Sequence, residues 1–71
     1  MKTKNLITAL TKVAKPKVTK EGGVEFKMGK KSVYVIDQSG LAVGLPLYNG
    51  SVVHNGNHTI KNLVAFLRGD S

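Results

Sequence analysis

A glycine turn between two short runs of alternating residues constrains the fold of this chain most tightly. Val24–Met28 alternates apolar and polar side chains, and Ser32–Ile36 is rich in β-branched and aromatic residues. Gly29-Lys30 between them fits a two-residue type II′ turn, which fixes the pairing register of a β-hairpin. Phe26 is then opposite Val33, so one face of the hairpin is apolar along its whole length. The opposite face is predicted to be polar with one exposed ring, its cross-strand neighbours being Glu25 with Tyr34 and Lys27 with Ser32.

Further turn signals extend the hairpin into a meander. Asp37-Gln38-Ser39-Gly40 resembles a type I turn followed by a left-handed glycine, and predicts a three-to-five-residue connection into a strand at 41–45. Asn49-Gly50 is a type I′ signal that pairs Tyr48 with Ser51. Because Pro46 has no backbone N–H, the segment around it is expected to be at most an edge strand.

Helical periodicity appears at both ends of the chain. Apolar residues recur at helical spacing over residues 3–14, with Thr3 as the expected N-cap and Pro16 as the helix stop. Residues 15–23 then form a polar, basic connector. A second amphipathic helix is predicted from Thr59 to Arg68, capped at its start by Asn57 or Thr59 and at its end by Gly69.

These elements predict one small basic α+β domain over residues 1–71. It has an N-terminal helix, a small antiparallel sheet of three to five strands in a meander of hairpins, and a C-terminal helix. A chain of 71 residues buries only about 60% of its unfolded surface, so its folding energy is nearly balanced and a homodimer stays open. With no cysteine, the sequence excludes disulfides, thiol catalysis and cysteine-based zinc sites.

The hydropathy of the sequence predicts a soluble protein. No run approaches the ~18 consecutive apolar residues that a membrane span needs. The apolar stretch near the N-terminus is interrupted by Thr8 and followed by Lys12, which is too short for a signal-peptide core. We therefore expect a cytoplasmic protein without a membrane partner.

The charge of the chain is concentrated in its N-terminal half. The formal net charge is +7 at pH 7, and nine of the ten lysines precede residue 32. Such an asymmetry is typical of a basic surface that meets a polyanion, although a net charge of this size also serves solubility alone. Lysine suits phosphate contacts, whereas reading of guanine edges favours arginine, of which Arg68 is the single example.

The leading functional prediction is a small non-enzymatic nucleic-acid-binding protein, with DNA favoured over RNA. Its contacts are expected to be dominated by phosphates, with Tyr34 as a ring for base stacking. The alternative is an accessory or inhibitory module, encoded by a phage, that docks on an acidic host protein. The predicted nucleic-acid-binding residues are Lys12, Lys15, Lys17, Lys20, Lys27, Lys30, Lys31 and Tyr34.

The sequence offers no catalytic or metal-binding constellation. His54 and His58 bracket a turn, but a metal site needs three or four ligands and only the scattered Asp37 and Asp70 could complete one. A histidine could act as a general base, yet no nucleophile, paired carboxylate or oxyanion motif accompanies it. We expect no enzymatic activity, no metal and no cofactor, and a polar loop leading into the last helix.

Overall fold

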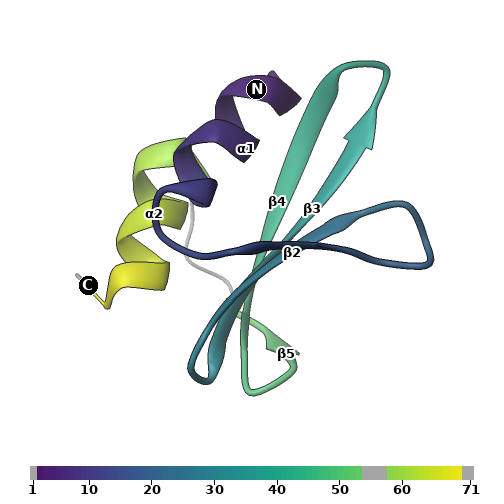
Figure 1. The fold of residues 1–71 in the computed structure, drawn as a ribbon. Helices are drawn as coiled ribbons and strands as arrows, with labels where there is room; N and C mark the ends of the chain where they lie inside the picture. Colours follow the sequence, from purple (N-terminus) through teal and green to yellow (C-terminus); the bar gives the residue numbers. More distant parts are fainter. Residues whose placement is uncertain (1, 54–57, 70–71) are drawn as a thin grey trace.

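The computed structural model describes residues 2–53 and 58–69 and has the predicted α+β architecture. An N-terminal helix, α1 (Thr3–Thr11), precedes five strands, and a C-terminal helix, α2 (Ile60–Arg68), follows them. Both helices lie together on one side of a single sheet, which gives two layers (Figure 1). The strands are β1 (Pro16–Val18), β2 (Val24–Met28), β3 (Lys31–Gln38), β4 (Leu41–Tyr48) and β5 (Ser51–Val52).

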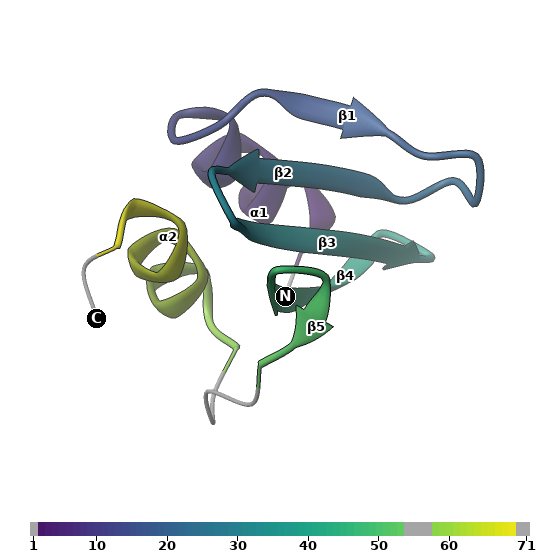
Figure 2. The same ribbon diagram turned by 90° about the horizontal axis from the view of Figure 1, so that it is seen from below.

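The sheet is an antiparallel meander in chain order, β1-β2-β3-β4-β5 (Figure 2). The predicted register of the central hairpin is confirmed, with Phe26 opposite Val33 and Glu25 opposite Tyr34. Gly29 alone has a positive φ in its turn, +65°, as the first position of a type II′ turn requires. Asn49 and Gly50 both have positive φ, and Tyr48 pairs with Ser51, which confirms the second hairpin.

The β3–β4 connection is shorter than expected. Ser39 and Gly40 both have positive φ, 57° and 83°, and Gln38 pairs with Leu41. This is a two-residue type I′ turn, so the prediction of a longer type I connection is wrong. The Asp37 carboxylate accepts a hydrogen bond of 2.9 Å from the Gly40 N–H, which stabilises the tight turn. Both strands therefore extend to the turn, and β3 and β4 are eight residues long.

The basic connector predicted at 15–23 contains a strand. Pro16–Val18 pairs with β2, placing Lys17 opposite Glu25. Pro16 is the first residue of this strand at the edge of the sheet, which is one of the few sheet positions that tolerate proline. The connector is thus confined to the β1–β2 loop at residues 19–23.

Pro46 lies inside β4, which continues through it. Pro46 pairs with Val33 of β3, and its carbonyl accepts a hydrogen bond of 2.9 Å from the Val53 N–H. The backbone edge of Pro46 that lacks an N–H therefore faces β5, which is only two residues long. A proline at this position removes no bond from the long β3–β4 ladder, so residues 41–48 form one strand rather than two.

Helix α1 begins and ends differently from the prediction. Lys2 is its N-cap, without a side-chain cap, and the Thr3 N–H donates a 3.0 Å bond to the Gly40 carbonyl. The β3–β4 turn thus satisfies an N–H group at the helix start, and Thr3 does not act as the N-cap. The helix ends at Thr11, earlier than the predicted residue 14, and residues 12–14 form a turn in which the Val13 and Ala14 N–H groups both donate to the Leu10 carbonyl.

The core lies between the two helices and the inner face of the sheet. At its centre Gly44 lets both helices approach β4. A Cβ atom at this position would lie 2.5 Å from Leu63 Cδ1 of α2 and 3.5 Å from Leu6 Cδ2 of α1. Only a glycine allows this approach without displacement of a buried leucine. The core cluster of buried residues consists of Leu6, Leu10, Phe26, Val33, Val35, Ala42, Leu63 and Leu67, and Pro46 of β4 is buried too.

Helix α2 has the predicted limits. Thr59 is its N-cap, and its hydroxyl accepts a 3.2 Å hydrogen bond from the Asn62 N–H. Gly69 ends the helix in the left-handed conformation, with φ of 81°. The alternative cap, Asn57, lies outside the described residues.

Thr59→Ala is expected to lower the free energy of unfolding by about 1 kcal/mol, because the N–H of Asn62 loses its capping acceptor. Chemical denaturation measures the change. Thr8→Ala, at an exposed position inside α1, is the control and should change stability by no more than about 0.5 kcal/mol. Equal losses for the two variants would show that the cap contributes nothing.

The outer face of the sheet carries no helix among the described residues (Figure 1). The predicted polar character holds on β2, where Glu25 and Lys27 face outward. On β3, Ser32 and Tyr34 also face outward as predicted, with the Tyr34 ring half-buried rather than exposed. The predicted polar face of the central hairpin is therefore confirmed at these four positions, and next to it the outward positions of β4 and β5 are apolar.

Candidate nucleic-acid interface

The predicted lysines divide between the two sides of the sheet. Five of them lie on β1, on β2 or in the turns that flank these strands, and we call these five the lysine ribbon. The other two, Lys12 and Lys31, lie on the helical side of the molecule. The lysine ribbon consists of Lys15, Lys17, Lys20, Lys27 and Lys30, all of them exposed.

Strand pairing places three of the ribbon lysines close together. Lys17 of β1 is opposite Glu25, and Lys27 is two residues further along β2 on the same face. Continuing the same register by one pair brings Lys15 next to Lys27. Among the described residues, none of the ribbon lysines forms an ion pair. Their positive charges are therefore available to an external anion.

Lys20, the fifth member of the ribbon, lies in the hydrogen-bonded β1–β2 loop. Thr19 organises the loop: its N–H donates to the Gly23 carbonyl at 2.8 Å, and its hydroxyl accepts from the Gly23 N–H at 3.1 Å. Gly22 takes a left-handed conformation, φ +86°, which closes the turn. Lys20 is thus presented to solvent by a hydrogen-bonded loop rather than by an irregular one.

Tyr34 ties this loop to the sheet. Its hydroxyl is 3.0 Å from the Thr19 hydroxyl, and the two share a hydrogen bond. Gly23 packs on the ring so closely that a Cβ atom there would lie 2.6 Å from Tyr34 Cζ and 2.9 Å from the Val35 carbonyl oxygen. The ring is half-buried by this contact. The structure gives Tyr34 a positioning role in the loop, and base stacking on it stays a prediction.

Gly23→Ala is expected to lower the free energy of unfolding by about 1–3 kcal/mol, because the added methyl group must displace either Tyr34 or the backbone. Denaturant unfolding measures the loss. Gly22→Asn is the matched control, since nothing lies within 4 Å of a Cβ there and asparagine tolerates positive φ. A Gly23→Ala protein as stable as Gly22→Asn would contradict the close packing of this loop on Tyr34.

Lys31 faces away from the lysine ribbon although it follows Lys30 directly. Its ammonium nitrogen lies 5.6 Å from the centre of the Phe66 ring, a cation–π contact. It also approaches Gly69, since a Cβ on that residue would be 3.6 Å from Lys31 Nζ. The C-terminal end of α2 favours a positive charge there. Lys31 therefore contributes to helix packing, in a place remote from the β1–β2 loop.

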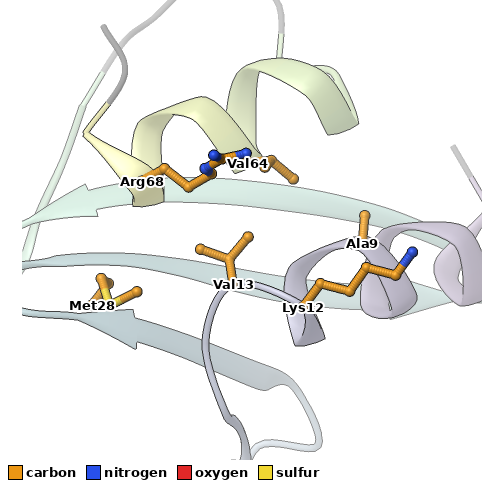
Figure 3. Close-up of a pocket in the computed structure, with 6 residues that line it drawn as sticks. All are labelled: Ala9, Lys12, Val13, Met28, Val64 and Arg68. Carbon is orange, nitrogen blue, oxygen red and sulfur yellow. The ribbon is translucent and has the colours of Figure 1, made fainter.

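Lys12 lines a groove between the two helices and the end of β2 (Figure 3). The groove has a volume of about 540 Å³, and Val13 and Val64 are among the apolar residues that line it. Arg68 lines it too, so the single arginine lies on the helical side and apart from the ribbon. Lys12 and Arg68 thus lie on the helical side of the sheet, and Lys17 and Lys27 face outward on the other side.

A second hollow lies where two hairpin turns meet on the outer side. The Asn49 N–H donates a 2.8 Å hydrogen bond to the Lys30 carbonyl, which joins the β2–β3 and β4–β5 turns. We call this depression, about 240 Å³ in volume, the hairpin-end hollow. It combines two ammonium groups, a hydroxyl, an amide and one carboxylate, and its lining residues are Glu25, Lys27, Gly29, Lys30, Ser32, Leu47, Asn49 and Gly50.

Sequence reasoning missed Ser32 and Asn49 as parts of the candidate site. A signal for them existed, because alternate turns of an antiparallel meander lie at the same end of the sheet. The Gly29-Lys30 and Asn49-Gly50 turns are separated by one intervening turn and therefore had to be neighbours.

Comparison with protein families, with curated proteins and with solved structures finds no match to this chain.

Within the described residues, no three histidine, cysteine or acidic side chains are grouped to hold a metal ion. His58 is half-buried, and His54 lies outside the described residues. No helix that the structure describes is long and apolar enough to cross a membrane.

Proposed function

We propose that the protein binds nucleic acid, with duplex DNA favoured over RNA, through phosphate contacts from the lysine ribbon. The observation that carries the proposal is a set of five exposed lysines on β1, β2 and the turns beside them, none of which forms an ion pair within residues 2–53 and 58–69. Glu21 and Glu25 are the only acids in this part of the chain, so the ribbon keeps a positive balance. Binding by such a surface releases counterions from the polyanion, which supplies its affinity.

Among the parts of the lysine ribbon, the hairpin-end hollow is the most suitable binding site for a single phosphate group. Lys27 and Lys30 both line it, with Ser32 and Asn49 as further residues that carry hydrogen-bonding side chains. Phosphate oxygens accept hydrogen bonds from all of these groups. The Glu25 carboxylate is also in the lining, and Lys17 is its cross-strand neighbour. The hollow is therefore expected to hold a phosphate only in concert with the rest of the ribbon.

Weak sequence selectivity follows from the same side chains. Lysine is a mobile point charge that contacts phosphates, whereas bidentate reading of guanine needs arginine. Arg68 lines the groove on the helical side, away from the ribbon. The proposed protein contacts the backbone of the nucleic acid and catalyses no reaction.

A fluorescence anisotropy titration against duplex DNA, single-stranded DNA and RNA of equal length tests the proposal. We expect all three polymers to bind, duplex DNA most tightly, with little dependence on base sequence. Absence of binding to every polymer in 0.05 M salt would contradict it. That result would favour the alternative, docking on an acidic protein, which predicts capture of one defined partner that is lost in a Lys27→Glu/Lys30→Glu variant.

A further inference from the structure

The outer face of the sheet holds a second surface that the lysine ribbon does not use. Six apolar side chains of β3, β4 and β5 share this face, as their cross-strand pairing shows. Leu41 is 60% exposed, Val43 57%, Val52 50% and Ile36 38%. We call this surface the outer apolar patch, and its members are Ile36, Leu41, Val43, Leu45, Leu47 and Val52.

A contiguous exposed apolar patch is typical of an interaction site in a soluble protein. Single exposed apolar residues need no explanation, but here they are adjacent. Val43 is opposite Ile36, and Leu47 is flanked by Ser32 on one side and Val52 on the other. Part of the patch forms a shallow hollow of about 330 Å³, lined by Ile36, Gln38, Leu41, Val43 and Leu45. An apolar side chain from a partner would fill it.

The charge distribution on this face identifies the partner. The patch itself contains no charged residue, while the outward-facing charges lie on β1 and β2, at Lys17, Glu25 and Lys27. An acidic partner or a polyanion would be drawn to the lysine ribbon and not to the patch. A second copy of this chain offers the same neutral surface, and a two-fold rotation matches patch to patch without burying an unpaired charge.

We propose that the outer apolar patch is the contact surface of a homodimer, in which two sheets pack face to face as a sandwich. Face-to-face sheets pack about 10 Å apart with their side chains interdigitated. When the two-fold axis is parallel to the strands, the β1–β2 edges of the two copies, with their lysine ribbons, lie at opposite sides of the dimer. The proposal does not depend on nucleic-acid binding, and each can fail without the other.

The size of the patch predicts a weak dimer. Strands of eight residues at ~3.4 Å per residue are about 27 Å long, and three strands at ~4.8 Å spacing are about 14 Å wide. The contact is therefore on the order of 400 Å² per copy, or about 800 Å² in total, below the ~1,200 Å² of a standard interface. We expect reversible dimerisation with a dissociation constant in the micromolar range.

The dimer contact and the proposed nucleic-acid binding are expected to respond to salt in opposite directions. Each copy carries a net charge of +7, so the two copies repel each other at low ionic strength. Added salt screens this repulsion and leaves apolar contact unaffected. Dimerisation is therefore expected to strengthen between 0.05 and 0.5 M salt, whereas phosphate binding weakens over the same range.

Sedimentation equilibrium of the full chain without nucleic acid, from 10 to 500 μM in 0.05 and 0.5 M NaCl, tests the dimer. We expect the mass to rise with concentration from 7.6 kDa towards twice that value, and more steeply at high salt. Val43→Lys should raise the dissociation constant at least tenfold. Val18→Lys is the matched control, because Val18 is 75% exposed on β1 outside the patch, and it should dimerise as the wild type does.

Circular dichroism shows whether the Val43→Lys protein is folded. If it is not, Leu41→Lys at the end of β4 provides the same measurement at a position that is 60% exposed. A wild-type chain that stays monomeric at 500 μM in 0.5 M salt overturns the proposal, and leaves the patch to a different partner. Dimerisation of a folded patch variant as strong as that of Val18→Lys overturns it equally.

Discussion

Replacement of Lys17, Lys27 and Lys30 by glutamine is expected to weaken binding to duplex DNA by about 500-fold in 0.1 M monovalent salt. Each phosphate contact contributes about 0.9 to the slope of log K against log salt, which is about 8-fold per contact between 0.1 and 1 M. Glutamine removes the charge and leaves a side chain of similar length, so the strands and turns should be preserved. Fluorescence anisotropy with a labelled duplex measures the loss.

The control for this variant removes three lysines elsewhere. Lys2, Lys4 and Lys61 are exposed and lie on or beside the helices, outside the lysine ribbon. Their replacement by glutamine lowers the net charge by the same amount, from +7 to +4. We expect only a small loss of affinity from this control. Equal losses in the two triple variants would mean that overall charge, and not the ribbon, attracts the DNA.

Phe26→Ala is expected to lower the free energy of unfolding by about 3–5 kcal/mol, the largest stability effect that we predict for one residue. Phe26 is fully buried on β2 between the sheet and the helices. The substitution leaves a cavity that the neighbouring side chains fill only in part. A domain of 71 residues has about 4–11 kcal/mol of stability in total, so this loss is a large fraction of it and the urea midpoint of the variant should be much lower than that of the wild type.

Met28→Ala tests whether that loss comes from burial. Met28 lies two residues further along the same strand, on the same face of the sheet, but it is 43% exposed. Urea unfolding should show a loss of about 1 kcal/mol or less for this control. A Phe26→Ala protein no less stable than Met28→Ala would contradict the position of the core.

The parts of the fold that follow from sequence are those set by local chemistry. The Gly29-Lys30 turn fixes the register of β2 and β3, because a two-residue connection leaves no freedom in which residues pair. Helix α2 is equally local, with a threonine that caps its start and a glycine in left-handed conformation that ends it. Its apolar stripe then determines which side packs against the sheet.

The parts that do not follow from sequence depend on contacts between distant segments. β1 is a strand because it lies beside β2, although Lys15 to Gly23 has the composition of a connector. Helix α1 starts without a capping side chain because the Gly40 carbonyl, from a turn far along the chain, accepts the Thr3 N–H. Neither contact has a signal within its own segment.

The candidate site shows the same division. The charge asymmetry of the chain predicts a basic surface, and the ribbon contains five of the seven predicted lysines. The sequence predicts that the adjacent Lys30 and Lys31 contact the same ligand. In the structure Lys30 lines the hairpin-end hollow, whereas Lys31 lies on the helical side of the sheet and contacts Phe66. Proximity along the chain therefore overstates how many lysines can meet one ligand.

The salt dependence of duplex DNA binding shows how many phosphates the lysine ribbon contacts. With about five phosphates contacted by the ribbon, log K should fall against log salt with a slope near −4.5 between 0.05 and 0.3 M. The variant with Lys17, Lys27 and Lys30 replaced by glutamine should give a slope near −1.8, about 0.9 for each lysine left. A wild-type slope shallower than about −1, or one that the triple variant leaves unchanged, would contradict phosphate binding by the lysine ribbon.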